Sequence, residues 1–300
     1  MLSYNYVIVL GAGASADYKF PTGRQLINEV AQRLSLEYPT WGPILERMGF
    51  GEPSLCSFRE RLVRADPPSI DAFLLNNPND TKLGKAATAL ALIQHETMES
   101  IGWAPDKKLY TYIYYKMGVQ PGEFISSANR LTIVTFNYDR SLEFYLYQSL
   151  TNLFGNDQVA KSFIRDKIIH VYGILGTPDF LAKDGRPFEP ICNEENIKKC
   201  IDSMWMITEA ESNPIRFDDT HHPIGAADVV CFLGFGYSRE NIRRLNIKQS
   251  WFKEKRFYGS AYGLAADDIE AINRFSDSSI RLGPTNEKAI EFMQNQSVLR

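Results

Sequence analysis

The sequence YVIVLGAGAS, residues 6–15, joins five apolar residues to a turn of Gly, Ala and Ser. A near-continuous Val, Ile and Leu run is typical of a buried parallel strand. Glycine lets the backbone turn sharply and approach a ligand closely, and the N–H groups at the start of a following helix attract an anion. The stretch therefore predicts a strand followed by a phosphate-binding turn made of Gly11, Ala12, Gly13, Ala14 and Ser15.

Two interpretations of this turn stay open at the level of sequence. The pattern Gly11-x-Gly13-x-x-Ala16 has the form of a dinucleotide turn and lies between a strand and a helix, as that motif requires. Ser15 adds a hydroxyl group where a phosphate oxygen would lie. A tightly packed turn that binds no ligand would use the same glycines.

Residues 25–128 carry helical patterns and no convincing strand. In a common dinucleotide-binding unit, the second strand follows the first helix and carries an acidic residue for the ribose about 20 residues on. That strand is absent from the expected place. The apolar spacing predicts helices at residues 24–34, 58–63, 70–76 after the N-cap Ser69, 84–100 and 109–117.

Five further apolar runs predict the remaining strands, at residues 131–136, 167–172, 228–233, 256–261 and 279–282. Helical patterns at 140–151 and 266–275 lie between some of them. Alternating strands and helices favour an α/β protein with an open, mostly parallel, Rossmann-like sheet and ligands along its carboxyl edge. We expect residues 1–300 to form one domain, with residues 25–128 as a mainly helical insertion or small second domain.

The composition excludes several classes of protein. Hydrophobic residues make up 44% of the chain, enough for a large core, and a formal charge of −3 argues against direct binding to nucleic acid. Neither a charged and apolar leader nor a membrane-spanning apolar run is present, so we expect a cytoplasmic protein that does not enter membranes.

No metal site is expected from the sequence. The four cysteines form no C-x-x-C pair, which argues against a zinc ribbon or a redox dithiol and favours reduced, partly buried thiols. His221 and His222 follow Asp218 and Asp219, but no spaced third ligand group accompanies them. We interpret residues 218–222 as a solvated loop.

Polar residues follow two of the predicted strands. Asn137 and Asp139 come directly after the strand at 131–136, where an amide and a carboxylate could both face a cleft, although Asp139 could instead cap the next helix. His170 and Tyr172 share one face of the strand at 167–172 by strand alternation. An imidazole there could act as a base or proton shuttle, or it could be a hydrogen-bonded core histidine.

Four separated motifs together resemble a known family: GAGAS at 11–15, TFNYD at 135–139, HVYG at 170–173 and LGFGYSxxN at 233–241. The set resembles the sirtuin fold, and more closely the sirtuin-like NAD-consuming domains of bacterial anti-phage defence systems. The segments SIDAF at 69–73 and YGL at 262–264 are also similar to that branch. The resemblance covers most of the chain in separated blocks.

The resemblance implies a site for NAD+. Residues 12–15 would hold its diphosphate, Asn137 would position the nicotinamide ribose or the attacking water, and Asp139 would lie beside the nicotinamide. His170 would be the third catalytic residue. The full set of implied contacts with NAD+ is Gly11, Ala12, Gly13, Ala14, Ser15, Pro21, Thr22, Thr135, Asn137, Asp139, Tyr172, Gly234, Gly236, Tyr237 and Asn241, of which Gly234, Gly236 and Asn241 would line the adenosine side.

The chain departs from the sirtuin pattern in two places. Sirtuin deacylases hold a structural zinc on two close pairs of cysteines, which this chain lacks, and this difference argues against protein deacylation. In their histidine motif the catalytic histidine directly precedes a glycine, whereas here Tyr172 precedes Gly173 and His170 lies two residues earlier. Which of the two takes the catalytic place stays open.

The reaction implied by the resemblance is hydrolysis of NAD+ to nicotinamide and ADP-ribose, which would deplete NAD+ in an infected cell. We then expect a homo-oligomer that is controlled by a separate partner protein, an ATPase or a nucleic-acid-guided sensor. A second interpretation is a sensor that binds NAD+ or ADP-ribose without turnover. A hydride-transferring dehydrogenase is a third, disfavoured because the ribose-binding acid is missing.

Overall fold

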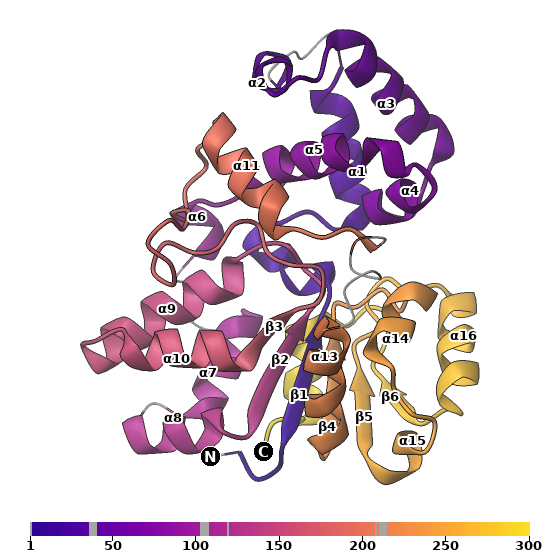
Figure 1. Ribbon diagram of the computed structural model, residues 1–300. Coiled ribbons are helices and arrows are strands. Elements are labelled where there is room, and N and C mark those ends of the chain that lie inside the picture. Colours follow the sequence, from indigo (N-terminus) through magenta and orange to yellow (C-terminus); the bar gives the residue numbers. More distant parts are fainter. Residues whose placement is uncertain (1, 36–40, 103–107, 119, 208, 210–214) are drawn as a thin grey trace.

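A six-stranded sheet forms the centre of the computed structural model (Figure 1), which describes residues 2–35, 41–102, 108–118, 120–207, 209 and 215–300. All neighbouring strands pair in parallel, in the order β3-β2-β1-β4-β5-β6. The prediction of an open, Rossmann-like α/β sheet is confirmed. The strands are β1 (Tyr6–Leu10), β2 (Leu131–Thr135), β3 (Ile168–His170), β4 (Val229–Leu233), β5 (Arg256–Gly259) and β6 (Ile280–Leu282).

The central strands form where the sequence is continuously apolar. All five residues of β1 and all five of β4 are buried, because helices cover both faces of a parallel sheet. Among the covering helices, α8 and α10 contact β2, and α16 contacts β6. The helices after β2 are α9 (Ser141–Phe154), α10 (Gln158–Lys167), α11 (Glu194–Ser203), α13 (Ile215–Ala226), α14 (Arg239–Leu245), α15 (Trp251–Glu254), α16 (Ala266–Ser276) and α17 (Ala289–Gln296).

The described residues between β1 and β2 are helical, as the sequence predicts. Figure 1 shows α1 to α5 as a lobe above the carboxyl ends of the strands. The N-cap predicted at Ser69 is confirmed, since its side chain accepts a hydrogen bond from the N–H of Ala72. These elements are the short 3-10 helices η1 (Ala12–Ala14) and η2 (Ala16–Tyr18), then α1 (Gly23–Arg33), α2 (Gly42–Arg47), α3 (Glu52–Ala65), α4 (Ile70–Asn76), η3 (Pro78–Asp80), α5 (Thr81–Ile93), α6 (Met98–Ile101), α7 (Leu109–Met117) and α8 (Pro121–Ala128).

Three local predictions are corrected by the structure. The helix expected at 84–100 is two helices, α5 and α6, because residues 94–97 leave the helical path. The loop expected around His221 and His222 lies instead within α13. The strand expected at 167–172 is only β3, so Tyr172 lies beyond its end.

The register of the sheet brings three turns together. Leu10, the last residue of β1, lies opposite Thr135 of β2 and opposite Leu233 of β4. The chain runs outward from β1 through β2 to β3, then crosses to β4 on the other side of β1 and runs outward again to β6. Open α/β sheets bind their ligands at such a point of reversal. The turns after Leu10, Thr135 and Leu233 are therefore neighbours at the carboxyl edge.

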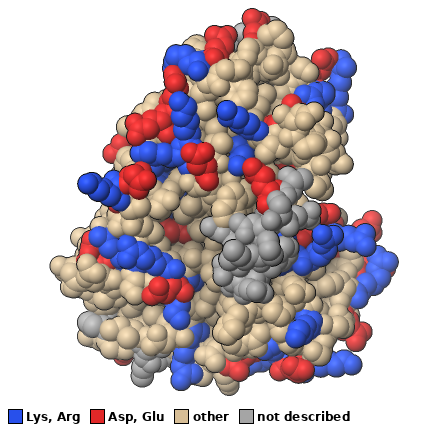
Figure 2. All heavy atoms as spheres, viewed as in Figure 1, with Lys and Arg blue, Asp and Glu red and all other residues tan. Residues whose placement is uncertain are grey.

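No helix in the described parts of the chain is both long and apolar enough to cross a membrane. On the face shown in Figure 2, Lys and Arg side chains are interspersed with Asp and Glu side chains.

Candidate active site

The turns after β1 and β4 pack backbone against backbone. The N–H of Gly13 donates to the carbonyl oxygen of Gly234 at 3.0 Å, and the N–H of Gly11 donates to that of Leu233 at 3.0 Å. A Cβ atom on Gly11 would lie 2.5 Å from the Gly234 oxygen, and one on Gly234 would lie 2.1 Å from the nitrogen of Ala14. Close packing of the two turns accounts for these glycines without a ligand.

The N–H groups of the turn after β1 are already in use within the protein. Besides the bond from Gly13, the N–H of Ala14 donates to Gly11 and that of Ser15 donates to Ala12, within the 3-10 helix η1. In this conformation a phosphate would not find these three donors free. Both interpretations of the turn, as a ligand site and as a tightly packed turn, therefore stay open.

Gly234→Ala is expected to lower the free energy of unfolding by at least about 2 kcal/mol, because strain at such a position costs about 1–3 kcal/mol before any steric overlap is added. Gly234 has a φ of 57°, in the left-handed region that disfavours a side chain. Gly236→Ala is the matched control, since a Cβ there meets nothing within 4 Å. Urea denaturation measures both, and equal stability of the two variants would contradict the packing account.

Asn137, buried at 9% exposure, ties the turn after β2 to the turn after β1. Its Nδ2 donates to the carbonyl oxygen of Gly11 at 3.0 Å and to Oγ of Ser15 at 3.0 Å. Its own N–H donates to Oγ1 of Thr135 at 3.1 Å. The structure therefore brings three of the predicted site residues, Asn137, Thr135 and Ser15, into direct contact.

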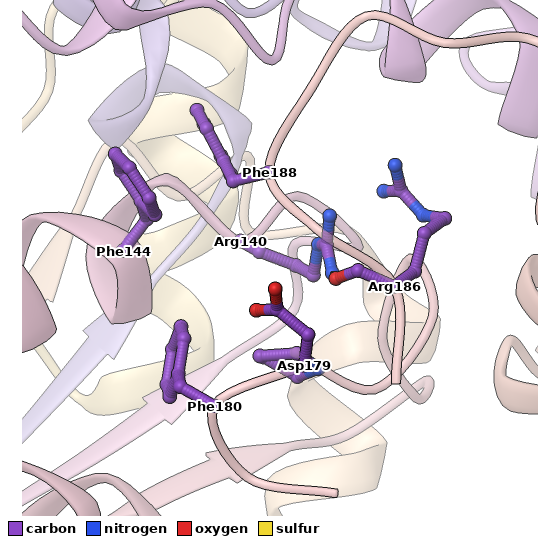
Figure 3. Close-up of a pocket in the computed structure, with 7 residues that line it drawn as sticks. Arg140, Phe144, Asp179, Phe180, Arg186 and Phe188 are labelled. Carbon is purple, nitrogen blue, oxygen red and sulfur yellow. The ribbon is translucent and has the colours of Figure 1, made fainter. Parts of the chain in front are cut away.

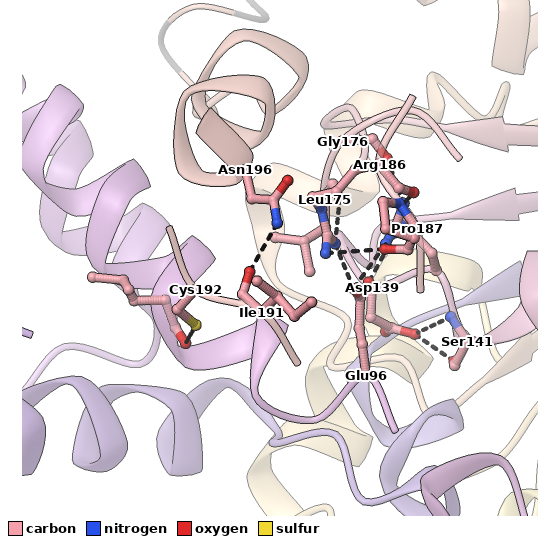
Figure 4. Close-up of polar contacts among 12 residues, drawn as sticks. Glu96, Asp139, Ser141, Leu175, Gly176, Arg186, Pro187, Ile191, Cys192 and Asn196 are labelled. Atoms are coloured by element: carbon pink, nitrogen blue, oxygen red, sulfur yellow. Dashed lines mark hydrogen bonds and ion pairs between the residues drawn. The ribbon is translucent and has the colours of Figure 1, made fainter. Parts of the chain in front are cut away.

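Asp139 joins the same site through two residues that sequence reasoning missed. Its Oδ1 accepts hydrogen bonds from the N–H of Ser141, at 3.1 Å, and from the hydroxyl of Ser141 (Figure 4). The Ser141 hydroxyl lies 3.0 Å from the hydroxyl of Tyr110, which lies 3.1 Å from that of Ser15. The capping role considered for Asp139 is thus present, because its carboxylate holds the first N–H of α9.

Asn137, Ser15, Tyr110, Ser141 and Asp139 belong to one buried hydrogen-bond network. Because an ionised carboxylate only accepts, the Ser141 hydroxyl donates to Asp139 and accepts from Tyr110. The Ser15 hydroxyl accepts from the Asn137 amide, and its one proton can go to Tyr110 or to Asp139. Burial raises the pKa of Asp139, although its hydrogen bonds with Ser141 and Ser15 oppose the shift.

His170 lies behind the site loop, which we define as residues 137–141. Its Nδ1 lies 2.9 Å from the carbonyl oxygen of Asn137, so it carries a proton and donates. Its Nε2 lies 2.6 Å from Oε1 of Glu143, a buried residue of α9. Burial lowers the pKa of His170, but the Glu143 carboxylate, the Asn137 carbonyl oxygen and Asp139 together outweigh burial, and the net pKa is raised. Both ring nitrogens are therefore occupied, as in a hydrogen-bonded core histidine.

Tyr172 contacts different elements from His170. Its hydroxyl donates to Oδ1 of Asn241, on α14, at 3.0 Å, and its ring packs edge-on against Phe136. Burial raises the pKa of Tyr172. The side-chain partners of His170 and Tyr172 thus lie on different helices, α9 and α14, although His170 ends β3 and Tyr172 follows it by two residues.

The remaining predicted contacts are more scattered. The Tyr237 hydroxyl is buried against Gly259 and has no hydrogen-bond partner among the described residues. Gly236 is exposed. Thr22 is the N-cap of α1 and bonds Gln25, and Pro21 precedes it in the same half-buried loop.

A hollow beside the site loop is lined by Arg140, Arg186, Asp179 and several aromatic rings (Figure 3). Its interior has essentially no room for a water molecule, so it is not a dinucleotide pocket. Within the described residues, no three His, Cys, Asp or Glu side chains gather as metal ligands.

Comparison with known proteins does not assign this site to a family. No protein-family model matches the chain, and no curated protein matches it significantly.

Proposed function

We propose that this protein is an NAD+ hydrolase of the sirtuin-like type that cleaves the bond between nicotinamide and ribose. One observation carries the proposal: Ser15 after β1 and Asn137 and Asp139 after β2 join one buried hydrogen-bond network beside the switch point of a Rossmann-like sheet. Open α/β sheets bind their ligands at that edge, and an amide and a carboxylate held rigidly there can orient a bound reactant.

The chemistry suits these groups. The bond between ribose C1′ and the nicotinamide nitrogen breaks with its electron pair moving to that nitrogen, so nicotinamide leaves as a neutral molecule. Water adds to C1′, and its proton passes to a base, for which Asp139 with its raised pKa is suited. Asn137 orients the ribose or the water, and the negative Asp139 stabilises the positive charge that develops on the ribose.

His170 has a different role in this proposal from the one its motif implies. Because its two nitrogens already bond Asn137 and Glu143, we assign it the task of holding the Asn137 backbone. Direct proton transfer to or from the substrate would require the ring to leave one of these partners.

Binding without turnover is a second candidate function, and a specific observation favours it. The three N–H groups of residues 13–15 and both nitrogens of His170 are engaged within the protein. Such a site could hold a nucleotide in a different conformation and signal its presence to a partner protein.

Product analysis separates the two candidates. The purified protein is incubated with NAD+, and nicotinamide, ADP-ribose and reduced NAD are quantified by chromatography, while calorimetry measures binding of NAD+. Equal amounts of nicotinamide and ADP-ribose support hydrolysis. Measurable binding with both products absent, also after addition of a lysate from phage-infected cells, supports the binding function and contradicts hydrolysis.

A further inference from the structure

The helical lobe contacts the site loop through two carboxylates, of which that of Glu96 is buried and that of Asp71 is half-buried. The hydroxyl of Tyr138 donates to Oδ1 of Asp71, on α4, at 2.7 Å. Arg140 donates from Nε and Nη2 to the two oxygens of Glu96, which follows α5, at 2.8 and 2.7 Å. Asp71 and Glu96 both belong to the segment between β1 and β2, so this segment reaches two residues of the loop directly.

Successive residues of the site loop contact two different groups of partners. The side chains of Asn137, Asp139 and Ser141 join the network of Ser15 and Tyr110, whereas those of Tyr138 and Arg140 reach the lobe. Asp139, the carboxylate with the proposed chemical role, lies between the two residues that the lobe holds. The position of its backbone therefore depends on both contacts.

The contact of Tyr138 with Asp71 is partly buried and directional. Tyr138 is 7% exposed, and burial raises the pKa of its hydroxyl, which therefore stays a donor at neutral pH. The same hydroxyl lies 3.2 Å from the carbonyl oxygen of Trp205, a longer contact. A hydrogen bond to a carboxylate is stronger than one to a neutral carbonyl group, so Asp71 is the partner that fixes the ring.

We propose that Asp71 is a positioning residue for NAD+ cleavage, acting through Tyr138 to hold Asn137 and Asp139 in place. This inference rests on the proposed function, and it assigns the helical lobe a direct part in the reaction. Tyr138 lies between Asn137 and Asp139 in the loop, so we expect loss of the bond to loosen the backbone that carries the amide and the carboxylate. A displacement of about 1 Å at such groups can cost a hundredfold in rate.

Kinetics of NAD+ cleavage test this role in three single variants and one double variant. Asp71→Ala and Tyr138→Phe are each expected to lower kcat about tenfold, with KM within threefold, because binding groups stay in place. Asp71→Asn keeps an acceptor for the hydroxyl and should recover part of the loss. The double variant should be no slower than Asp71→Ala, because both changes remove one interaction.

Asp80→Ala is the matched control. Asp80 also belongs to the lobe and bonds Arg61 through both oxygens, but it has no contact with the site loop. Its kcat should equal that of the wild type. If Asp71→Ala is far slower than Tyr138→Phe, Asp71 acts on the substrate directly and the inference is overturned; unchanged kcat in both also overturns it.

Hydrogen exchange separates failure of this inference from failure of the proposed function. The N–H groups of Asn137 and Ser141 are bonded inside the loop, to Thr135 and Asp139. A peptide covering residues 136–142 should exchange about tenfold faster in Asp71→Ala and Tyr138→Phe than in the wild type and Asp80→Ala. Unchanged exchange contradicts a positioning role even if no variant cleaves NAD+, and faster exchange in an inactive protein contradicts only the proposed function.

Discussion

Glu96→Gln is expected to lower the free energy of unfolding by about 3–5 kcal/mol, the usual cost of removing one partner from a buried ion pair. Glu96 is fully buried and pairs with two arginines, Arg140 and Arg186, which are themselves buried. Figure 4 shows Glu96 beside Arg186. The cluster already holds one more positive than negative charge. Loss of the negative charge would leave two guanidinium groups without a counter-charge in the cluster, next to neutral acceptors that include the carbonyl oxygens of Gly176 and Leu175.

Two further variants make this expectation specific. Arg186→Met should cost less than Glu96→Gln, because Arg140 and Glu96 remain as a balanced pair joined by two hydrogen bonds. Glu29→Gln should cost less than about 1 kcal/mol, since Glu29 bonds His95 at a partly exposed position. Urea denaturation gives all three values, and a cost for Glu96→Gln as small as that for Glu29→Gln would refute the account of the cluster.

Asp139→Asn is expected to lower kcat about a hundredfold while leaving thermal stability unchanged or slightly raised. General-base and electrostatic groups commonly contribute factors of about 10²–10⁴ in rate. The amide has the same shape, and its oxygen can still accept from the N–H of Ser141 at the start of α9. It also removes a charge whose burial is unfavourable, as the raised pKa of Asp139 indicates.

Measuring kcat and thermal stability together shows whether Asp139 takes part in the chemistry. Steady-state kinetics and thermal denaturation are measured on the same preparations. If Asp139→Asn lowers stability and leaves kcat within threefold of the wild type, the carboxylate is only a helix cap and has no part in the chemistry.

The fold could be predicted because its strands have continuous apolar sequences. Residues 6–10 and 229–233 are buried over their full length, and such runs between helical patterns have few alternatives to a parallel sheet. The predicted ends of the helices and strands were less accurate. Nothing in the periodicity of residues 84–100 shows that the helix breaks after Ile93, and the polar run around His221 is helical through its packing, with its ring 5.0 Å from that of Trp251.

The candidate site could be predicted only in part. Asn137 and Asp139 are found from the sequence because they directly follow a strand whose carboxyl end must face the ligand edge. Tyr110 and Glu96 cannot be found in this way, since they come from helices and turns more than 25 residues away, and only the packing of the lobe brings them to the loop. The sequence indicates Glu143 only weakly, because this residue lies four residues after Asp139 at helical spacing.

Nicotinamide release from saturating NAD+ by the wild type and by Asn137→Ala, side by side, tests the central claim most directly. The Asn137 amide bonds both Gly11 and Ser15 of the turn after β1 and so joins that turn directly to the site loop. The account predicts release by the wild type and a rate at least about a hundredfold lower in the variant. Equal rates in the two proteins, or no release by the wild type under any condition in which it binds NAD+, would contradict it.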